Sequence, residues 1–225
     1  ATGSISMAGT LASGTAEDLA GIALAQMIRP GTPVVFGIQS TAADMRGGIT
    51  FACAAPEGTL MQGFAANMGK FYGMPSRGGG CQTDAPLINC QAGYESMLTF
   101  YSAWRHGINM VMEAGGVMDS VNATSFEKMI VDFEIIRQVK AAFTPFEVNE
   151  ETLNLEEIKE IGHTGSFITA ESTMDNFGDL YAPKVGSRTG KKPEYFKESI
   201  DKELARLLKK YETNPPALDA ETDRR

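Results

Sequence analysis

The sequence predicts an α/β protein, a (β/α)8 barrel of the TIM type, from three observations. Apolar runs typical of strands begin near Ser4, Val34, Tyr72 and Ile108, and a loop and a helix follow each run. The runs are spaced by roughly 30–40 residues, which is the repeat of a βα unit with parallel strands. No βα turn carries the GxGxxG pattern expected of an open dinucleotide-binding sheet, so a barrel is favoured.

The number of units leaves two possibilities open. Roughly four or five βα units fit in the chain, whereas a closed barrel has eight strands. Either further strands precede Ala1, or the sheet is open. We expect this chain to supply roughly the C-terminal half to two-thirds of a barrel. Residues 1–190 would then belong to the catalytic barrel domain, and residues 191–225 would form an amphipathic helix and a polar tail.

The first two units are predicted from apolar runs and helix signals. Residues 4–9 are predicted as a short strand, and Thr15 as the N-cap of a helix that ends before Pro30. Residues 33–38 are apolar and rich in β-branched side chains, which is typical of a strand buried on both faces. Residues 57–71 repeat apolar side chains at helical spacing and predict a second helix.

The third unit contains a run of three glycines. A short strand is predicted at residues 72–75, and residues 77–80 (RGGG) are predicted as a loop. Adjacent glycines cost chain entropy that packing alone would not justify. The loop could bind phosphate, make a plain tight connection or form part of an active site, and we favour the active site. The phosphate reading is the weakest, because neither GxGxxG nor GxxxxGKS/T is present.

The remaining elements follow the same signals. A strand is predicted at residues 108–113, and a last short strand or turn at residues 165–169. Leu153, Leu155 and Ile158 are expected to face inward from an acidic helix. The helices predicted in this part of the chain span residues 91–105, 126–143, 147–159 and 193–211.

Composition argues against several classes of protein. The formal net charge is −8, so nothing indicates binding to nucleic acid. No apolar run reaches the ~18 residues that a membrane span needs. The three cysteines are too few for a disulfide framework and fit the reducing cytoplasm. With two histidines in the whole chain, a dense metal site is not expected.

Polar residues that follow the predicted strands form the candidate site, because the active site of a parallel α/β barrel lies at the carboxyl ends of its strands. Gln39, Arg77 and Glu113 occupy such positions, and Thr169 or Glu171 would join them. A carboxylate after an apolar run is costly alone, so Glu113 either pairs with a cation of the protein or meets a cationic substrate. Arg77 is either the partner of Glu113 or an anchor for a substrate carboxylate.

Other candidate residues have a structural reading beside the functional one. Cys81 could act as a nucleophile, but no histidine lies near it in sequence, and a free structural cysteine is the favoured reading. Met112 and other methionines near the expected barrel mouth either fill core gaps or line a site for a large flat apolar partner. His106 and His163 are read as packing or surface residues rather than ligands.

Several blocks of the sequence resemble the trimethylamine:corrinoid methyltransferase family. The blocks keep the family's order and approximate spacing from Ser4 to Phe143, and more loosely to Tyr181. They are PGTP at residues 30–33, FYGMPSRGGG at 71–80, TDA at 83–85, QAGYE at 91–95 and ATSFEK at 123–128. The family's fold is a (β/α)8 barrel, which agrees with the repeated βα units.

The resemblance implies a reaction and a partner. A methyl group would pass by in-line displacement from a small methylated amine to the Co(I) of a corrinoid (cobalamin), which a separate corrinoid protein presents at the barrel mouth. The chain itself would bind no cofactor tightly and would form a homo-oligomer. Glu113 and Cys81 would lie at the reacting centre, with Arg77, Gln39 and Met112 around the substrate. The alternatives are a non-catalytic binding protein for a cationic amine and an inactive barrel fragment.

The resemblance leaves the substrate open between trimethylamine and a quaternary amine such as glycine betaine. Family members that act on trimethylamine carry pyrrolysine, which this sequence lacks, and Cys81 lies close to that position. Arg77 would bind the carboxylate of a betaine. The betaine enzymes carry histidine at the position of Glu113, however, and glutamate there favours a simple amine. The two clues conflict.

Overall fold

The computed structural model of the protein describes residues 3–188 and 191–215, and it confirms an α/β fold with long helices and small sheets. The α-helices are α1 (Met7–Ile28), α2 (Pro56–Phe71), α3 (Cys90–Arg105), α4 (Phe126–Ala142), α5 (Glu150–Leu153), α6 (Leu155–Ile161), α7 (Glu171–Asn176) and α8 (Tyr195–Thr213). The strands are β1 (Ala42–Asp44), β2 (Ile49–Ala52), β3 (Arg77–Gly79), β4 (Met110–Met112), β5 (Val117–Met118) and β6 (Ala123–Thr124).

Three extended segments lie side by side in parallel, in chain order. The segment at residues 33–38 joins the chain before β3 through a parallel bridge between Phe36 and Ser76. β3 then pairs in parallel with β4, with Gly78 opposite Val111. α2 connects the first of these segments to the second, and α3 connects the second to the third. This is the repeated βα order that the sequence predicts, although the segment at 33–38 forms a single bridge rather than a longer strand.

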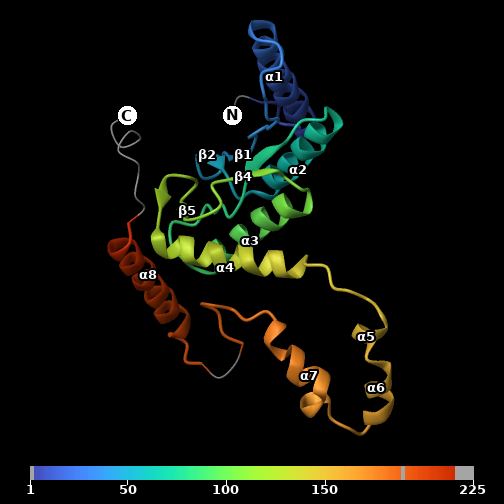
Figure 1. Ribbon diagram of the computed structural model, residues 1–225. Coiled ribbons are helices and arrows are strands. Elements are labelled where there is room, and N and C mark those ends of the chain that lie inside the picture. The colour runs from blue at the N-terminus through green and yellow to red at the C-terminus, as the bar shows by residue number, and fades with distance from the viewer. Residues whose placement is uncertain (1–2, 189–190, 216–225) are drawn as a thin grey trace.

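The long helices stack in the order of the chain. Figure 1 shows α1, α2, α3 and α4 following one another, with α8 lying against α4, and each neighbouring pair is in contact. The helices predicted at 57–71, 91–105 and 126–143 are confirmed as α2, α3 and α4. Their starts are set by local chemistry: Asn89 and Ser125 accept hydrogen bonds from backbone amides in the first turns of α3 and α4.

The largest apolar cluster lies between α3, α4 and α8. Phe100 of α3, Ile135 of α4 and Ile200 of α8 are buried in it, and Val185 from the segment before α8 is buried beside them. The helix predicted at 193–211 is thus confirmed as α8, and its apolar stripe faces the rest of the protein.

The strand predicted at residues 4–9 is wrong, because most of this run lies in α1. Ser6, not Thr15, is the N-cap, and its hydroxyl accepts a hydrogen bond from the amide of Gly9 at 3.1 Å. Thr15 lies inside the helix. The short apolar run fits either element by its pattern, and the cap decides the outcome.

The prediction of a strand at 72–75 and a glycine loop at 77–80 is also wrong in its register. The chain turns at Gly73, which has a φ of 66°, and the strand begins later, at Arg77. Gly78 and Gly79 are therefore part of β3. A Cβ on Gly79 would lie 2.6 Å from the side-chain amide of Gln82, so any larger residue here would displace that amide.

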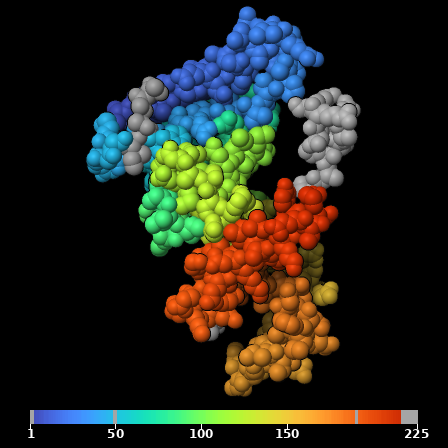
Figure 2. All heavy atoms as spheres, turned by 90° about the vertical axis from the view of Figure 1, so that its left-hand side faces the viewer, coloured from blue at the N-terminus to red at the C-terminus, as the bar shows by residue number. Residues whose placement is uncertain are grey.

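A helical arm extends from the end of α4. α5, α6 and α7 lie away from the stacked helices in Figure 1, and Figure 2 shows the same segment projecting from the body of the protein. None of these three helices has a buried residue. The prediction that Leu153, Leu155 and Ile158 face inward is wrong here, because about half of each side chain's surface is exposed. The run predicted as a strand or turn at 165–169 contains a short 3-10 helix, Phe167–Thr169.

Candidate functional site

The candidate site lies where the three parallel segments end. The amide of Arg77 donates to the carbonyl of Phe36 at 2.9 Å, and the amide of Gly80 donates to the carbonyl of Met112 at 3.1 Å. These bonds fix the relative register of the segments up to their carboxyl ends. The residues that follow, Gln39, Cys81 and Glu113, therefore leave the same edge.

Glu113 is held by a neutral partner. The side-chain amide of Gln82 donates a hydrogen bond to the carboxylate of Glu113, and Gln82 itself is almost fully buried. The amide of Gln82 passes directly over Gly79, where a side chain would block it. Glu113 has a φ of 55°, in the left-handed region that non-glycine residues seldom adopt, and it is partly exposed. Backbone strain of this kind is concentrated at functional sites.

Arg77 has a different partner from Glu113. Its guanidinium donates a hydrogen bond to the side-chain carbonyl of Gln39, and its aliphatic stem lies over the backbone of Gly37. Within the described residues, 3–188 and 191–215, no ion pair involves Arg77 or Glu113. Of the two readings of Arg77, the pairing with Glu113 is therefore not the arrangement found.

Cys81 lies at the end of β3 but is fully buried in the largest apolar cluster. Burial, together with the negative charge of Asp132, raises the pKa of its thiol well above the ordinary range. The thiol is thus held in its protonated form, whereas a nucleophile needs the thiolate. The backbone of Cys81 is in the left-handed region, with a φ of 51°.

Of the other residues singled out in the sequence, one lies beside the site and the rest lie away from it. Met112 is partly exposed on β4, beside the site. Thr169 and Glu171 lie just before and at the start of α7, which Figure 1 shows well away from β4, so they do not join the site. His106 packs its ring against Gly63 and His163 is exposed, in agreement with a packing or surface role.

Sequence reasoning missed a buried ion pair beneath the site. Lys128 and Asp132 on α4 are both fully buried, and Lys128 Nζ lies 2.5 Å from Asp132 Oδ1. Desolvation raises the pKa of Asp132 from 3.8 to about 6. The spacing of four residues on the face of α4 that carries Val131 and Ile135 was a readable signal.

A second polar cluster anchors the loop after Gln82. Asp84 Oδ1 accepts from the amide of Cys53 at 2.9 Å and from the hydroxyl of Ser120 at 2.8 Å. Glu95 of α3 accepts from the amide of Asp84 at 2.9 Å and the hydroxyl of Thr83 at 2.6 Å. These contacts use neighbouring donors to satisfy the carboxylates, so the cluster fixes loops rather than offering an open site.

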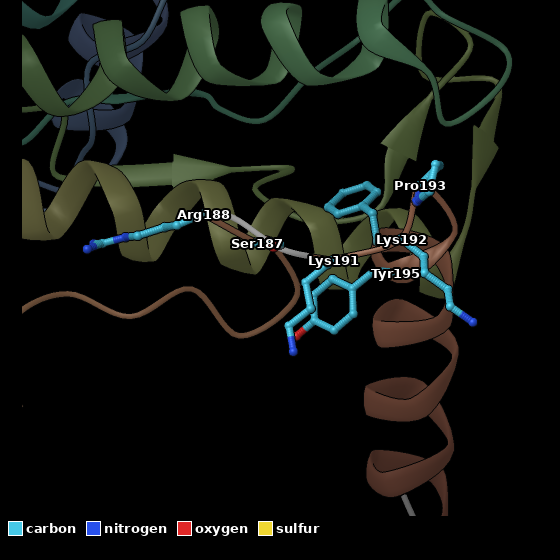
Figure 3. Close-up of a pocket in the computed structure, with 8 residues that line it drawn as sticks. Ser187, Arg188, Lys191, Lys192, Pro193 and Tyr195 are labelled. Carbon is cyan, nitrogen blue, oxygen red and sulfur yellow. The ribbon is translucent and has the colours of Figure 1, made fainter.

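Two hollows lie on the other side of the helices, next to the segment before α8. One, of about 420 Å³, runs between α3, α4 and Tyr181. The other, of about 510 Å³, is open and has basic residues on its wall, including Arg188, Lys191 and Lys192 (Figure 3). Neither includes a residue of the candidate site, so the chemistry is assigned to the strand ends and not to these hollows.

Two further features are absent from the described ranges. No group of three or more His, Cys, Asp or Glu side chains there is arranged to hold a metal ion. No helix there has both the length and the hydropathy to cross a bilayer. What the described part presents is an α/β protein with a candidate ligand site at the carboxyl ends of its parallel segments.

Comparison with known proteins identifies the family. The sequence model of the family described as trimethylamine methyltransferase (MTTB) matches residues 1–224. A glycine betaine methyltransferase of Desulfitobacterium hafniense (strain Y51) is 37% identical over 228 residues, which cover 99% of this chain and 47% of that protein. The trimethylamine methyltransferase MttB of Methanosarcina thermophila is 35% identical over 167 residues, which cover 74% of this chain and 34% of that protein.

This chain belongs to the trimethylamine methyltransferase family, which confirms the resemblance found in its sequence. It spans about half the length of the first of these relatives, and about a third of the second.

Proposed function

We propose that the protein containing this chain transfers a methyl group from a methylated amine to the Co(I) of a corrinoid carried by a separate protein. Family membership supports methyl transfer, and relatives are named as methyltransferases of glycine betaine and of trimethylamine. The parallel βα order supports a (β/α)8 barrel to which the rest of the protein contributes the other strands.

The proposal rests on the exposure of Glu113 and on its uncharged hydrogen-bond partner. Its carboxylate is partly exposed at the end of β4 and is oriented by an uncharged amide, so its negative charge is not cancelled by the bond that orients it. A quaternary ammonium group has no N–H and trimethylammonium has only one, so each is recognised mainly by charge and shape. A fixed carboxylate at a partly desolvated strand end supplies that charge.

The direction of charge flow assigns Glu113 to binding. In an in-line displacement the bond between methyl carbon and nitrogen breaks, and its electron pair goes to nitrogen. The positive charge on nitrogen is therefore lost as the reaction proceeds. A carboxylate that attracts this charge stabilises the bound substrate more than the transition state, so Glu113 should lower KM rather than raise kcat.

Arg77 and Gln39 bear on the choice of amine. The guanidinium of Arg77 is held by a neutral side chain, as Glu113 is, so both charges remain available for a ligand. A zwitterion such as glycine betaine would use both groups, with its carboxylate at Arg77 and its trimethylammonium group at Glu113. Trimethylamine would use Glu113 alone. We favour the zwitterion on this ground.

The corrinoid enters this proposal as a substrate that its own protein presents, and this protein holds no cofactor tightly. The partly exposed side chains of Met110 and Met112 on β4 support an apolar contact with a flat macrocycle near the site. Cys81 would shape the loop that carries Gln82, because its buried, protonated thiol is unsuited to attack.

The test uses the full-length protein, a reduced corrinoid protein and either glycine betaine or trimethylamine. Methyl transfer is followed by the absorbance change from Co(I) to methylated cobalt. We expect Glu113→Gln to raise KM without lowering kcat, and Arg77→Gln to raise KM for glycine betaine but not for trimethylamine. The control is Glu160→Gln, at an exposed position of α6.

Four outcomes would count against parts of the proposal. Absence of transfer with every methylated amine would reject the reaction, and calorimetric binding without transfer would favour the non-catalytic binding protein. An unchanged KM in Glu113→Gln would remove the electrostatic role of Glu113 while leaving the reaction in place. Equal effects of Arg77→Gln on both amines would remove the argument for a zwitterion.

A further inference from the structure

The buried pair of Lys128 and Asp132 has no part in the reaction proposed above. Both side chains are fully buried on α4, and their charged atoms lie 2.5 Å apart. Neither can touch a substrate in this arrangement. The removal of two charged groups from water costs free energy, so we looked for a role of this pair beyond stability.

Each member of the pair holds the loop that follows one of the two parallel strands. Lys128 Nζ donates to the carbonyl of Cys81 at 3.1 Å, and this carbonyl also accepts from Ser96 at 3.1 Å. Asp132 Oδ2 accepts from the amide of Gly116 at 2.7 Å. A single ion pair therefore connects the loop after β3 to the loop after β4.

These two loops carry the two partners of the central contact of the site. Cys81 immediately precedes Gln82, the donor to Glu113, and Gly116 comes three residues after Glu113. Cys81 and Glu113 both have left-handed backbones, with φ values of 51° and 55°. Such conformations persist where the surroundings over-determine them, and Lys128 and Asp132 supply part of that constraint.

Stability alone is a weak reason to keep this pair. Apolar side chains of similar volume often replace a buried ion pair without loss of stability, whereas a buried pair fixes one arrangement of its neighbours. The chain offers a comparison in Lys197 and Asp201 of α8, which have the same residue types and spacing at 2.7 Å. That pair is largely exposed and contacts no loop of the site.

We propose that Lys128 and Asp132 are positioning residues that hold the loops after β3 and β4 in register, so that Gln82 orients Glu113 toward a cationic methylated amine. The inference rests on the proposed function of Glu113. Lys128 and Asp132 lie beneath the site, and through them α4 fixes the geometry of Gln82 and Glu113, which belong to other segments.

The experiment replaces the pair without leaving a buried charge alone. Lys128→Met/Asp132→Leu removes both bonds to the loops, and Lys197→Met/Asp201→Leu is the matched control. Binding of glycine betaine to the full-length protein is measured by calorimetry, beside the tert-butylacetic acid anion, an isostere in which carbon replaces the quaternary nitrogen and the positive charge is absent. We expect the first variant to lose about tenfold or more in affinity for glycine betaine, with affinity for this isostere nearly unchanged.

A rescue variant separates positioning from general destabilisation. Lys128→Met/Asp132→Asn removes both charges but keeps a side-chain carbonyl that can accept from the amide of Gly116. We expect it to recover part of the affinity for glycine betaine. Hydrogen exchange should show lost protection at Gly116 in Lys128→Met/Asp132→Leu and restored protection in the rescue variant, with no change in the control.

The outcomes distinguish this inference from the proposed function. If the wild-type protein binds no methylated amine, the proposed function fails. If the wild-type protein binds the amine and a folded Lys128→Met/Asp132→Leu variant binds it equally well, the positioning role is overturned. Equal loss for glycine betaine and its isostere would also overturn it, because a general loss of structure would then account for the effect.

Discussion

Substitution of Gly79 by alanine tests the link between close packing and function at the site. A Cβ at this position would lie 2.6 Å from three atoms of the Gln82 side-chain amide. Ordinary contact requires about 3.5–4.0 Å, so the amide must move by about 1 Å. A movement of this size away from the carboxylate breaks or seriously weakens the hydrogen bond from Gln82 to Glu113.

The expected size of the effect follows from the kind of bond that is lost. A hydrogen bond to a charged group contributes about 1.5–3 kcal/mol to the arrangement that it holds, which sets an upper limit of about 10- to 150-fold on the loss of affinity for a cationic amine. Overpacking at a buried glycine would also lower the free energy of unfolding by about 1–3 kcal/mol. Calorimetric titration measures the affinity, and denaturant unfolding measures the stability.

The control is Gly21→Ala, because a Cβ on Gly21 in α1 meets no atom within 4 Å. Alanine is the better helix former, so this change should stabilise slightly and leave amine binding unaffected. The reasoning is refuted if Gly79→Ala is destabilised as expected but binds the amine as tightly as the wild-type protein. Gln82 would then not be what orients Glu113.

Three further predictions concern the body of the protein. Ile200→Ala should lower the free energy of unfolding by about 2–5 kcal/mol, because it opens a cavity between α8 and α4, whereas Leu208→Ala at an exposed position should change it by less than about 0.5 kcal/mol. The pKa of Asp132 is raised from 3.8 to about 6, because the folded protein favours the protonated carboxyl. The stability that this preference contributes is present below pH 4 and is lost as the pH rises to 6. Relative to Asp132→Asn, the wild-type protein should therefore lose stability over this range in denaturant unfolding, and a flat difference would contradict the assignment. A thiol reagent should modify Cys90 quickly and Cys81 only after unfolding, since Cys90 is exposed and Cys81 is buried, and peptide mass spectrometry would identify the labelled residue.

The helices were the most predictable part of the fold. α2, α3 and α4 begin and end within one or two residues of their predicted limits, because apolar periodicity and local start signals both specify them. The start signal is a proline in the first turn of α2 and a side-chain cap in α3 and α4. The strand predicted at residues 4–9 was wrong because the local signals there fit either a strand or a helix. Ser6 and Thr15 are both suitable caps by residue type, and the hydrogen bond from the amide of Gly9 to Ser6 starts α1 at Met7.

The glycine run shows what sequence could not supply. Glycine has a low preference for strands, so β3 was predicted as a loop. Its strand conformation depends on neighbours distant in sequence, such as β4, which pairs with it, and Gln82, whose amide occupies the space above Gly79. The exposed leucines of the arm are a similar case, because an amphipathic pattern predicts a buried face but not what covers it.

At the site, candidates could be named from the sequence, but not all of their places and none of their partners. Gln39, Arg77 and Glu113 were identified because polar residues that follow apolar strands gather at the edge where a parallel α/β sheet binds its ligands. Gln39 and Glu113 do follow parallel segments, whereas Arg77 is the first residue of β3, opposite Met110. The bond between Gln82 and Glu113 joins residues 31 apart in sequence, and no local pattern indicates it. The pair of Lys128 and Asp132 was readable in principle, since two charges four residues apart on an apolar helix face must either be paired or disrupt the core.

The partners of Arg77 and Glu113 answer the question that the sequence left open about these two charges. Had they paired with each other, the guanidinium and the carboxylate would have cancelled, and the strand ends would have offered a ligand little beyond apolar contact. Each is instead bonded to a side-chain amide, Arg77 to Gln39 and Glu113 to Gln82. An amide fixes the direction of a charged group without neutralising it, so each charge remains available to a ligand. A charge that is oriented but unpaired at a partly desolvated position costs free energy in the empty protein, and a ligand group of opposite charge removes that cost when it binds.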